Sequence, residues 1–169
     1  AVMVAINPDG IERWRYQEPN VAASVPALSN DETQVYVVFS GHATLLSDHL
    51  MAFNAKALTP TILWDVSSGN SFNTIAAVVD PQDRILVNNF VSSFLNTGHI
   101  RAFSKTGGQL WVSPDVGLPS APVITPEGKI GVVSSGMLSI LDSAAGTIDQ
   151  IISLPLSPIP NVLSDQDGT

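Results

Sequence analysis

The chain has 169 residues, of which 44% are hydrophobic and 13% charged, and its formal net charge at pH 7 is −8. Such apolar content with so little charge excludes an intrinsically disordered chain, and the acidic balance disfavours nucleic acid as a partner. Cysteine is absent, which excludes a disulfide framework, a thiolate metal site and a cysteine nucleophile, and no apolar run approaches the ~20 residues of a transmembrane helix.

The predicted elements are short β-strands. In chain order, the β-rich runs are residues 2–6, 35–39, 85–87, 99–103, 109–113, 120–124 and 129–134. Polar turn signals lie at residues 30–32, 80–83, 125–128 and 165–168. The runs are rich in Val, Ile and Phe and are broken by Gly, Pro, Asn and Asp, and no long window shows a helical stripe. The sequence therefore predicts an all-β fold.

A tryptophan recurs at nearly regular intervals. Trp14, Trp64 and Trp111 are separated by 50 and 47 residues, and each follows an apolar segment that ends in a similar triplet. The triplets are Ala5-Ile6-Asn7, Ala52-Phe53-Asn54 and Ala102-Phe103-Ser104, with a fourth copy at Ile140-Leu141-Asp142. The step from triplet to tryptophan is 9, 12 and 9 residues, and a step of 9 from Ile140 reaches Asp149. About four short strands in each repeat of roughly 40–50 residues is typical of a β-propeller blade.

The best-formed copy runs from Ala102 to Trp111 and contains Thr106-Gly107. It resembles the tryptophan-docking motif of the PQQ-like (quinoprotein alcohol dehydrogenase-like) β-propeller repeat family, in which Ala, Asp, a Thr-Gly pair and Trp recur. The Ala5–Trp14 copy matches more loosely, the Ala52–Trp64 copy has an insertion and no glycine, and the fourth copy lacks the tryptophan. The resemblance implies four-stranded antiparallel blades, with Trp14, Trp64 and Trp111 docking each blade on a backbone carbonyl of the next.

The expected domain is a single partial β-propeller over residues 1–169, with about three and a half blades and repeats of approximately 1–49, 50–99, 100–136 and 137–169. Closed propellers typically have four to eight blades. We therefore expect either a fragment of a larger propeller, with the remaining blades as its partner, or ring closure by self-association. A complete small β-sandwich is the alternative fold, and it does not explain the tryptophan spacing.

No complete catalytic or metal-binding set is visible. His49 and His99 occupy equivalent positions before the second and third triplets, which indicates a strand-start role, and the spacing from His42 to His49 does not suit a zinc site. Ser40-Gly41-His42 has neither a nucleophile-elbow motif nor an identifiable acid partner. Residues 165–168 read Asp-Gln-Asp-Gly, like the start of a calcium loop, but their position equals that of three other turns.

Two connections carry extra apolar residues, which makes them candidate partner-contact loops. These residues are Leu45 and Leu46 in the first connection and Phe90, Phe94 and Leu95 in the second. Loops on one propeller face are common binding surfaces. The alternative interpretation is that these residues fold over a blade edge and lengthen the strands.

The favoured function is a non-enzymatic binding or scaffold module that mediates protein–protein contacts or assembly and needs no cofactor. The alternative is a segment of a PQQ- and Ca²⁺-dependent dehydrogenase whose site lies partly outside this chain. The resemblance also implies an extracytoplasmic (periplasmic or secreted) location.

Overall fold

The computed structural model describes residues 1–41, 48–67, 76–92 and 97–155. Within these ranges the chain forms strands and turns and no helix, so no helix there could span a membrane. The strands are β1 (Val2–Ile6), β2 (Glu12–Gln17), β3 (Ala22–Ala23), β4 (Ala27–Leu28), β5 (Gln34–Ser40), β6 (His49–Asn54), β7 (Ile62–Ser67), β8 (Val78–Val79), β9 (Ile85–Ser92), β10 (Thr97–Phe103), β11 (Gln109–Val112), β12 (Val123–Ile124), β13 (Ile130–Ser134), β14 (Met137–Leu141) and β15 (Ile148–Ser153).

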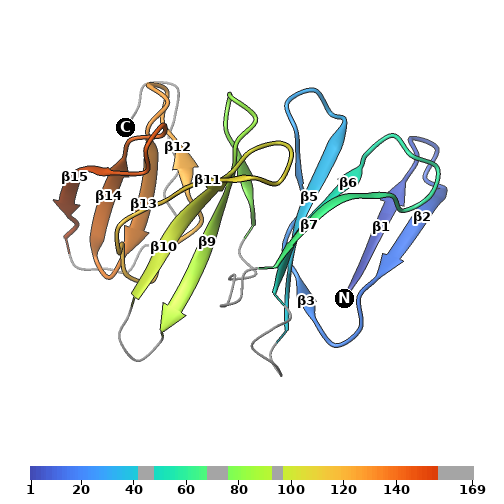
Figure 1. The fold of residues 1–169 in the computed structure, drawn as a ribbon, viewed down its shortest axis with the longest axis horizontal. Helices are drawn as coiled ribbons and strands as arrows, with labels where there is room; N and C mark the ends of the chain where they lie inside the picture. Colours follow the sequence, from blue (N-terminus) through green and yellow to red (C-terminus); the bar gives the residue numbers. More distant parts are fainter. Residues whose placement is uncertain (42–47, 68–75, 93–96, 156–169) are drawn as a thin grey trace.

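The strands form four antiparallel sheets that follow one another along the long axis of the molecule (Figure 1). The first sheet is β1-β2, the second β3-β5-β6-β7 with β4 also on β5, the third β8-β9-β10-β11, and the fourth β12-β13-β14-β15. Within each sheet, strands that follow one another in the chain pair, as in a propeller blade, except that β3 and β4 both pair with β5. The prediction of an all-β partial propeller is confirmed.

The second sheet is a four-stranded blade whose first strand is interrupted. β3 and β4 both pair with β5, and the chain between them contains Pro26, which has no N–H to donate to a ladder. At the interruption, Ser24 N donates to Val38 O at 2.8 Å, and Ser24 Oγ accepts from Val38 N at 3.0 Å. Ser120 and Val133 make the same pair of contacts in the fourth sheet, at 2.8 and 3.1 Å. This serine therefore replaces ladder bonds where the first strand bends.

The sheets are divided at different points of the chain from the repeats seen in the sequence. Each tryptophan lies on the last strand of its sheet, namely Trp14 on β2, Trp64 on β7 and Trp111 on β11. A sequence repeat therefore joins the last two strands of one sheet to the first two strands of the next. The tryptophan period marks the contacts between sheets rather than the boundaries of sheets.

The apolar core consists of three clusters, one between each pair of neighbouring sheets. Alternate residues of β5 serve two of them: Val37 and Phe39 face the first sheet, while Tyr36 and Val38 face the third. All four side chains are fully buried. A strand that is covered on both faces reads as a continuous apolar run, which explains the sequence of residues 35–39. The third cluster joins the third and fourth sheets and includes Trp111.

Candidate functional site

Two of the three tryptophans bind the following sheet in the same way. Trp64 Nε1 donates a hydrogen bond to Lys105 O at 2.8 Å, and Trp111 Nε1 donates to Ser143 O at 3.1 Å. Each acceptor belongs to the residue directly after a triplet. Each indole thus links the last strand of one sheet to a turn of the next.

A glycine lies beneath each of these rings. Gly107 has a φ of 84° and Gly146 a φ of 71°, in the left-handed region that disfavours other residues. A Cβ at Gly107 would lie 2.9 Å from Trp64 Cδ2, and one at Gly146 would also come under 3.0 Å of the Trp111 ring. Glycine is therefore required at both positions for two reasons, namely its backbone conformation and the space that the ring occupies.

Trp14 is packed differently. It is buried and stacks on Phe53, with ring centroids 6.1 Å apart and an interplanar angle of 24°, but no hydrogen-bond partner for its Nε1 is found among the described residues. The carbonyl that corresponds to Lys105 O is Ala55 O, which accepts from Arg13 Nη1 at 3.1 Å. The turn that carries Ala55 is longer than the others, because Asn54 N bonds Thr61 O. The insertion seen in the sequence thus coincides with a missing indole hydrogen bond.

In the fourth sheet, the residue at the tryptophan position is Gln150 rather than Asp149. Trp111 pairs with Ala102 across the ladder, and the corresponding pair is Gln150 with Ile140. The shift by one residue arises in the turn, where Asp142 N bonds Thr147 O, whereas Ser104 N bonds Gly108 O. The fourth sheet therefore presents an amide where the others present an indole.

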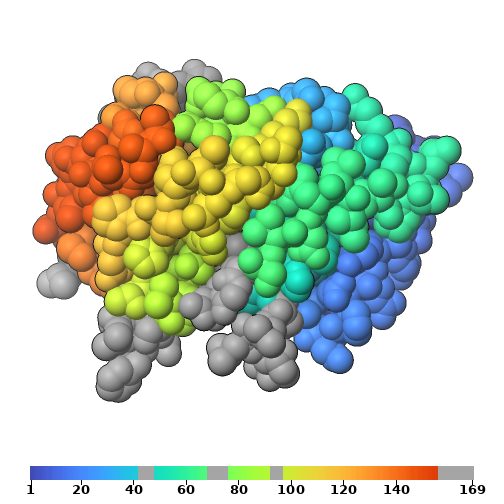
Figure 2. All heavy atoms as spheres, in the orientation of Figure 1, coloured from blue at the N-terminus to red at the C-terminus, as the bar shows by residue number. Residues whose placement is uncertain are grey.

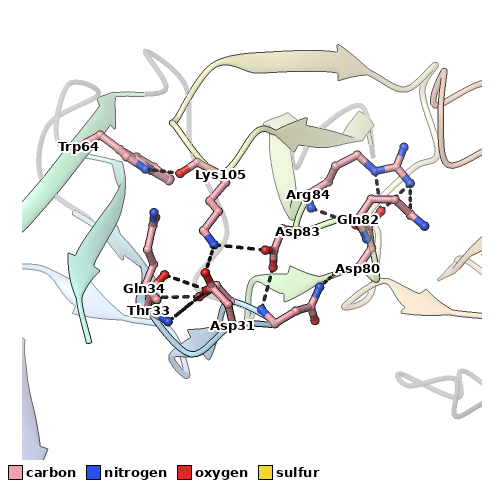
Figure 3. Close-up of polar contacts among 11 residues, drawn as sticks. Asp31, Thr33, Gln34, Trp64, Asp80, Gln82, Asp83, Arg84 and Lys105 are labelled. Atoms are coloured by element: carbon pink, nitrogen blue, oxygen red, sulfur yellow. Dashed lines mark hydrogen bonds and ion pairs between the residues drawn. The ribbon is translucent and has the colours of Figure 1, made fainter. Parts of the chain in front are cut away.

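A network of charged side chains joins the second and third sheets (Figure 3). Lys105 Nζ lies 2.6 Å from Asp31 Oδ2 and 3.3 Å from Asp83 Oδ2. Asn30 N donates to Asp83 Oδ1 at 2.7 Å, and Asn30 Nδ2 donates to Asp80 O at 2.8 Å. These contacts connect the turn before β5 to the turn before β9, so they hold two sheets in register.

The network continues to the fourth sheet through Arg84. Arg84 Nε donates to Asp80 Oδ2 at 2.5 Å, and Arg84 Nη1 donates to Ser143 O, the carbonyl that also accepts from Trp111. Asp80 is 1% exposed, and its Oδ1 accepts from the backbone N–H groups of Gln82 and Arg84. We call Asn30, Asp31, Asp80, Asp83, Arg84 and Lys105 the inter-sheet network.

The ion pair of Lys105 with Asp31 favours the charged forms of both groups. The hydrogen bond from Lys105 is the largest cause of a pKa of Asp31 well below its usual range, with further contributions from Ser29 and Thr33. The same hydrogen bond raises the pKa of Lys105. Burial, together with the nearby charges of Asp83 and Asp31, raises the pKa of Tyr36 to about 12. Asp31 and Lys105 are therefore fully charged and Tyr36 is neutral at neutral pH, which suits a structural role and not proton transfer.

The histidines do not meet. His49 Nδ1 lies 2.7 Å from Asp65 Oδ1, and His99 Nδ1 lies 2.9 Å from Ser113 O. His42 lies outside the described residues. Within the part of the chain that the structure describes, no group of three or more His, Asp or Glu side chains is placed to hold a metal ion.

The candidate loop residues lie mostly outside the described ranges. Phe90 is half-buried on β9. Leu45, Leu46, Phe94 and Leu95 are not among the described residues, and neither are residues 165–168. The partner-contact prediction for these loops therefore stays a prediction.

The comparisons with known proteins show the fold. No protein-family model matches the sequence, and no curated protein matches it either. Solved structures do match. One is a eukaryotic initiation factor, with 10% sequence identity and a TM-score of 0.60. The match covers 80% of this chain and 33% of the initiation factor chain. A protein from Lactobacillus plantarum has 13% identity, a TM-score of 0.55, and coverage of 77% and 41%.

A putative 6-phosphogluconolactonase from Bacteroides fragilis is similar to the same extent, with 14% identity, a TM-score of 0.54, and coverage of 83% of this chain and 42% of its own. The chain thus spans about a third to two fifths of the length of these structures. At such low identity the likeness shows a β-propeller-like fold and nothing about activity.

The inter-sheet network was not found from the sequence. Asp31 and Asp83 belong to the turns before β5 and β9, and Lys105 belongs to the turn between β10 and β11; the repeat pattern locates all three turns but not the charges they carry. Lys105 and Asp31 are 74 residues apart in the chain. The turn positions indicate where charged residues lie along the chain. Which charged residues form ion pairs depends on how closely the sheets stack.

Proposed function

We propose that this chain is a non-enzymatic binding or scaffold module, built on PQQ-like propeller repeats, that mediates protein–protein contacts or assembly. The observation that carries the proposal is a set of exposed apolar side chains on the last strands of the sheets. These residues are Ile62, Leu63, Leu110, Val112, Ile151 and Ile152, each between 38% and 55% exposed. They belong to β7, β11 and β15, which end their sheets.

Leu63 and Leu110 are the most instructive pair, because each directly precedes a docking tryptophan. Leu63 is 45% exposed and Leu110 is 50% exposed. The segments that carry them, green and yellow in Figure 2, lie next to each other on the face shown there. Exposed apolar residues on strands that end their sheets, as the described residues place them, favour contact with another protein.

The inter-sheet network supports a scaffold role. Its carboxylates bind Lys105, Arg84 and backbone N–H groups of neighbouring turns. Three sheets are linked by these contacts together with the two indole hydrogen bonds. Such links favour a rigid surface over a site that rearranges during a reaction.

The second candidate function is the segment of a PQQ- and Ca²⁺-dependent dehydrogenase. Its support is the resemblance of the repeats. Among the residues that the structure describes, no group of three or more His, Asp or Glu side chains is placed to hold a metal ion. The chain also lacks the vicinal cysteine pair that often contacts the quinone in that family.

The binding role is tested by placing charges on the apolar surface. The double variant Leu63→Lys/Leu110→Lys and the wild type are compared as bait in extracts of the cells that produce the protein. The control is Val25→Lys/Leu58→Lys, two apolar residues that are 68% and 80% exposed elsewhere. We expect the wild type and the control to capture a protein from the extract, and we expect the Leu63→Lys/Leu110→Lys variant to fail to capture it. Equal capture by all three would contradict the proposal.

A second measurement addresses the dehydrogenase. PQQ and Ca²⁺ are added to the protein, and dye-linked dehydrogenase activity and quinone absorbance are recorded. The scaffold proposal expects neither signal, so dye-linked activity would overturn it. By the same resemblance we propose an extracytoplasmic location, which is checked by fractionation of the producing cells.

A further inference from the structure

Polar side chains are buried between the third and fourth sheets, which lie side by side (Figure 1). Leu86 on β9 and Val132 on β13 belong to the apolar cluster that joins these two sheets. Asn88 follows Leu86 by two residues on β9, and Ser134 follows Val132 by two residues on β13. Because alternate residues of a strand share a face, Asn88 and Ser134 face each other's sheet across this interface.

Ser139 adds a third polar group to the same interface. It pairs with Val132 across the ladder of β13 and β14, and directly paired residues of antiparallel strands lie on one face. Asn88, Ser134 and Ser139 are 1%, 5% and 7% exposed, respectively. We call these residues the buried polar cluster.

Two atoms of the buried polar cluster lack a hydrogen bond. Asn88 Nδ2 donates to Pro119 O at 2.8 Å and to Ser120 O at 2.7 Å. For Asn88 Oδ1 and Ser134 Oγ, however, no partner is found among the described residues. A buried polar atom without a hydrogen bond is costly, and nearly all such atoms in folded proteins are bound by protein groups or by ordered water.

A chain of hydrogen bonds places these two atoms in the same part of the interface. Ser120 O accepts from Asn88 Nδ2, and Ser120 N donates to Val133 O at 2.8 Å. Val133 directly precedes Ser134. The two unpartnered atoms are also chemically complementary, because an amide oxygen only accepts a hydrogen bond, whereas a hydroxyl both donates and accepts.

The second sheet shows which side chains occupy the corresponding positions in another interface. When the triplets of the two sheets are aligned, Ser134 and Ser139 correspond to Phe39 and Met51. Phe39 and Met51 are buried in the apolar cluster with the first sheet. Serine is far smaller than phenylalanine or methionine, so these two positions fill much less of the interface in the fourth sheet. A polar site with room for one small molecule suits water.

We propose that Asn88, Ser134 and Ser139 form a binding site for a buried water molecule between the third and fourth sheets. The water donates to Asn88 Oδ1 and accepts from the hydroxyl of Ser134, and Ser139 Oγ is a further partner. Buried waters typically make about two to four hydrogen bonds to polar groups that otherwise lack a partner. The water joins two sheets at a level where the first and second sheets are joined by apolar packing. This inference goes beyond the proposed binding function and does not depend on it.

The first test counts the water. Magnetic relaxation dispersion of the water oxygen detects long-lived buried waters in the protein, and we expect one fewer in Ser134→Val than in the wild type. Valine removes the hydroxyl and places a methyl group in the space of the water. The matched control is Ser153→Val, at an exposed position of β15, which should keep the wild-type count. Circular dichroism verifies that both variants fold.

The second test uses the sign of a stability change. If Ser134 Oγ binds the water, Ser134→Ala removes a hydrogen bond, and the urea midpoint should fall. If Ser134 Oγ has no partner at all, removal of a buried polar atom leaves the midpoint unchanged or raises it. Ser153→Ala is the control, and its midpoint should equal that of the wild type because the Ser153 side chain is exposed.

Four results overturn the inference. These are equal water counts in the wild type and a folded Ser134→Val variant, a lower count in Ser153→Val as well, a Ser134→Ala midpoint at or above that of the wild type, or a crystal structure in which Ser134 Oγ donates directly to Asn88 Oδ1. The proposed function is tested separately, because capture through Leu63 and Leu110 does not involve the buried polar cluster. Failure of one test without the other therefore shows which proposal is wrong.

Discussion

The indole of Trp111 rests directly on Gly146, on a turn of the neighbouring sheet, so closely that a Cβ at this glycine would come under 3.0 Å of ring atoms. The same indole donates to Ser143 O, three residues earlier in that turn. The packing of this one side chain thus depends both on the backbone conformation at Gly146 and on the position of the next sheet. Stability measurements on such pairs can show how strongly neighbouring sheets are coupled.

Gly146→Ala should destabilise the fold more than Gly128→Ala. Both glycines have a positive φ, so both substitutions carry the cost of a left-handed residue, about 1–2 kcal/mol. Only at position 146 does the added methyl collide with an indole, which should cost roughly a further 1–3 kcal/mol. The free energy of unfolding in urea measures the difference. Equal losses at the two positions would show that the ring moves aside freely.

Trp64→Phe should cost more stability than Trp14→Phe. Both substitutions replace an indole that packs between sheets by a smaller ring without an N–H group. Trp64 Nε1 donates to Lys105 O, whereas no partner for Trp14 Nε1 is found among the described residues. The expected difference in the free energy of unfolding is about 1 kcal/mol, the typical contribution of one hydrogen bond. Denaturant unfolding of the two variants checks it, and a larger loss for Trp14→Phe would contradict the assignment of these bonds.

Arg84→Met should be strongly destabilising. It removes the cation that pairs with the 1% exposed Asp80 and also the hydrogen bond to Ser143 O. Breaking a buried pair on one side costs about 3–5 kcal/mol, because the buried carboxylate of Asp80 loses its countercharge and keeps its hydrogen bonds from backbone N–H groups. Arg84→Met/Asp80→Asn should recover part of this loss. If the double variant is less stable than Arg84→Met, the role of Asp80 in binding backbone N–H groups outweighs its charge.

The ion pair of Asp31 with Lys105 predicts a stability profile with losses at both ends of the pH scale. The pKa of Asp31 is lowered, so its contribution is present above the unfolded value of about 3.9 and is lost as pH falls through the folded pKa. The pKa of Lys105 is raised, so its contribution is present below about 10.4 and is lost as pH rises through the folded pKa.

Asp31→Asn tests this profile. The variant should lose stability at neutral pH, and its stability should fall less steeply on acidification than that of the wild type. A residual acid dependence is expected, because hydrogen bonds to backbone N–H groups also lower the pKa values of Asp115 and Asp142. Urea midpoints across the acid range provide the measurement. Parallel profiles for variant and wild type would mean that the Lys105 contact contributes nothing to folding.

Much of the architecture was predictable because it depends on local patterns. The period of Trp14, Trp64 and Trp111 and the β-rich runs between polar turns predicted stacked antiparallel sheets, and strands β9, β10 and β13 lie where those runs are. The fourth copy shows the limit of spacing alone. A count of nine residues from Ile140 reaches Asp149, but a longer turn places Gln150 at the docking position.

Repeated β-units with a tryptophan between them follow from the amino-acid sequence alone, since apolar runs and the placing of turn residues act over short distances. The partners of individual groups follow from the folded structure instead. The indoles of Trp64 and Trp111 each bind a carbonyl of the next sheet, Arg13 binds the carbonyl of Ala55, and Lys105 bridges Asp31 and Asp83. These pairings depend on turn length and on the stacking of whole sheets. Residues far apart in the chain meet only after that stacking, so no local pattern specifies them.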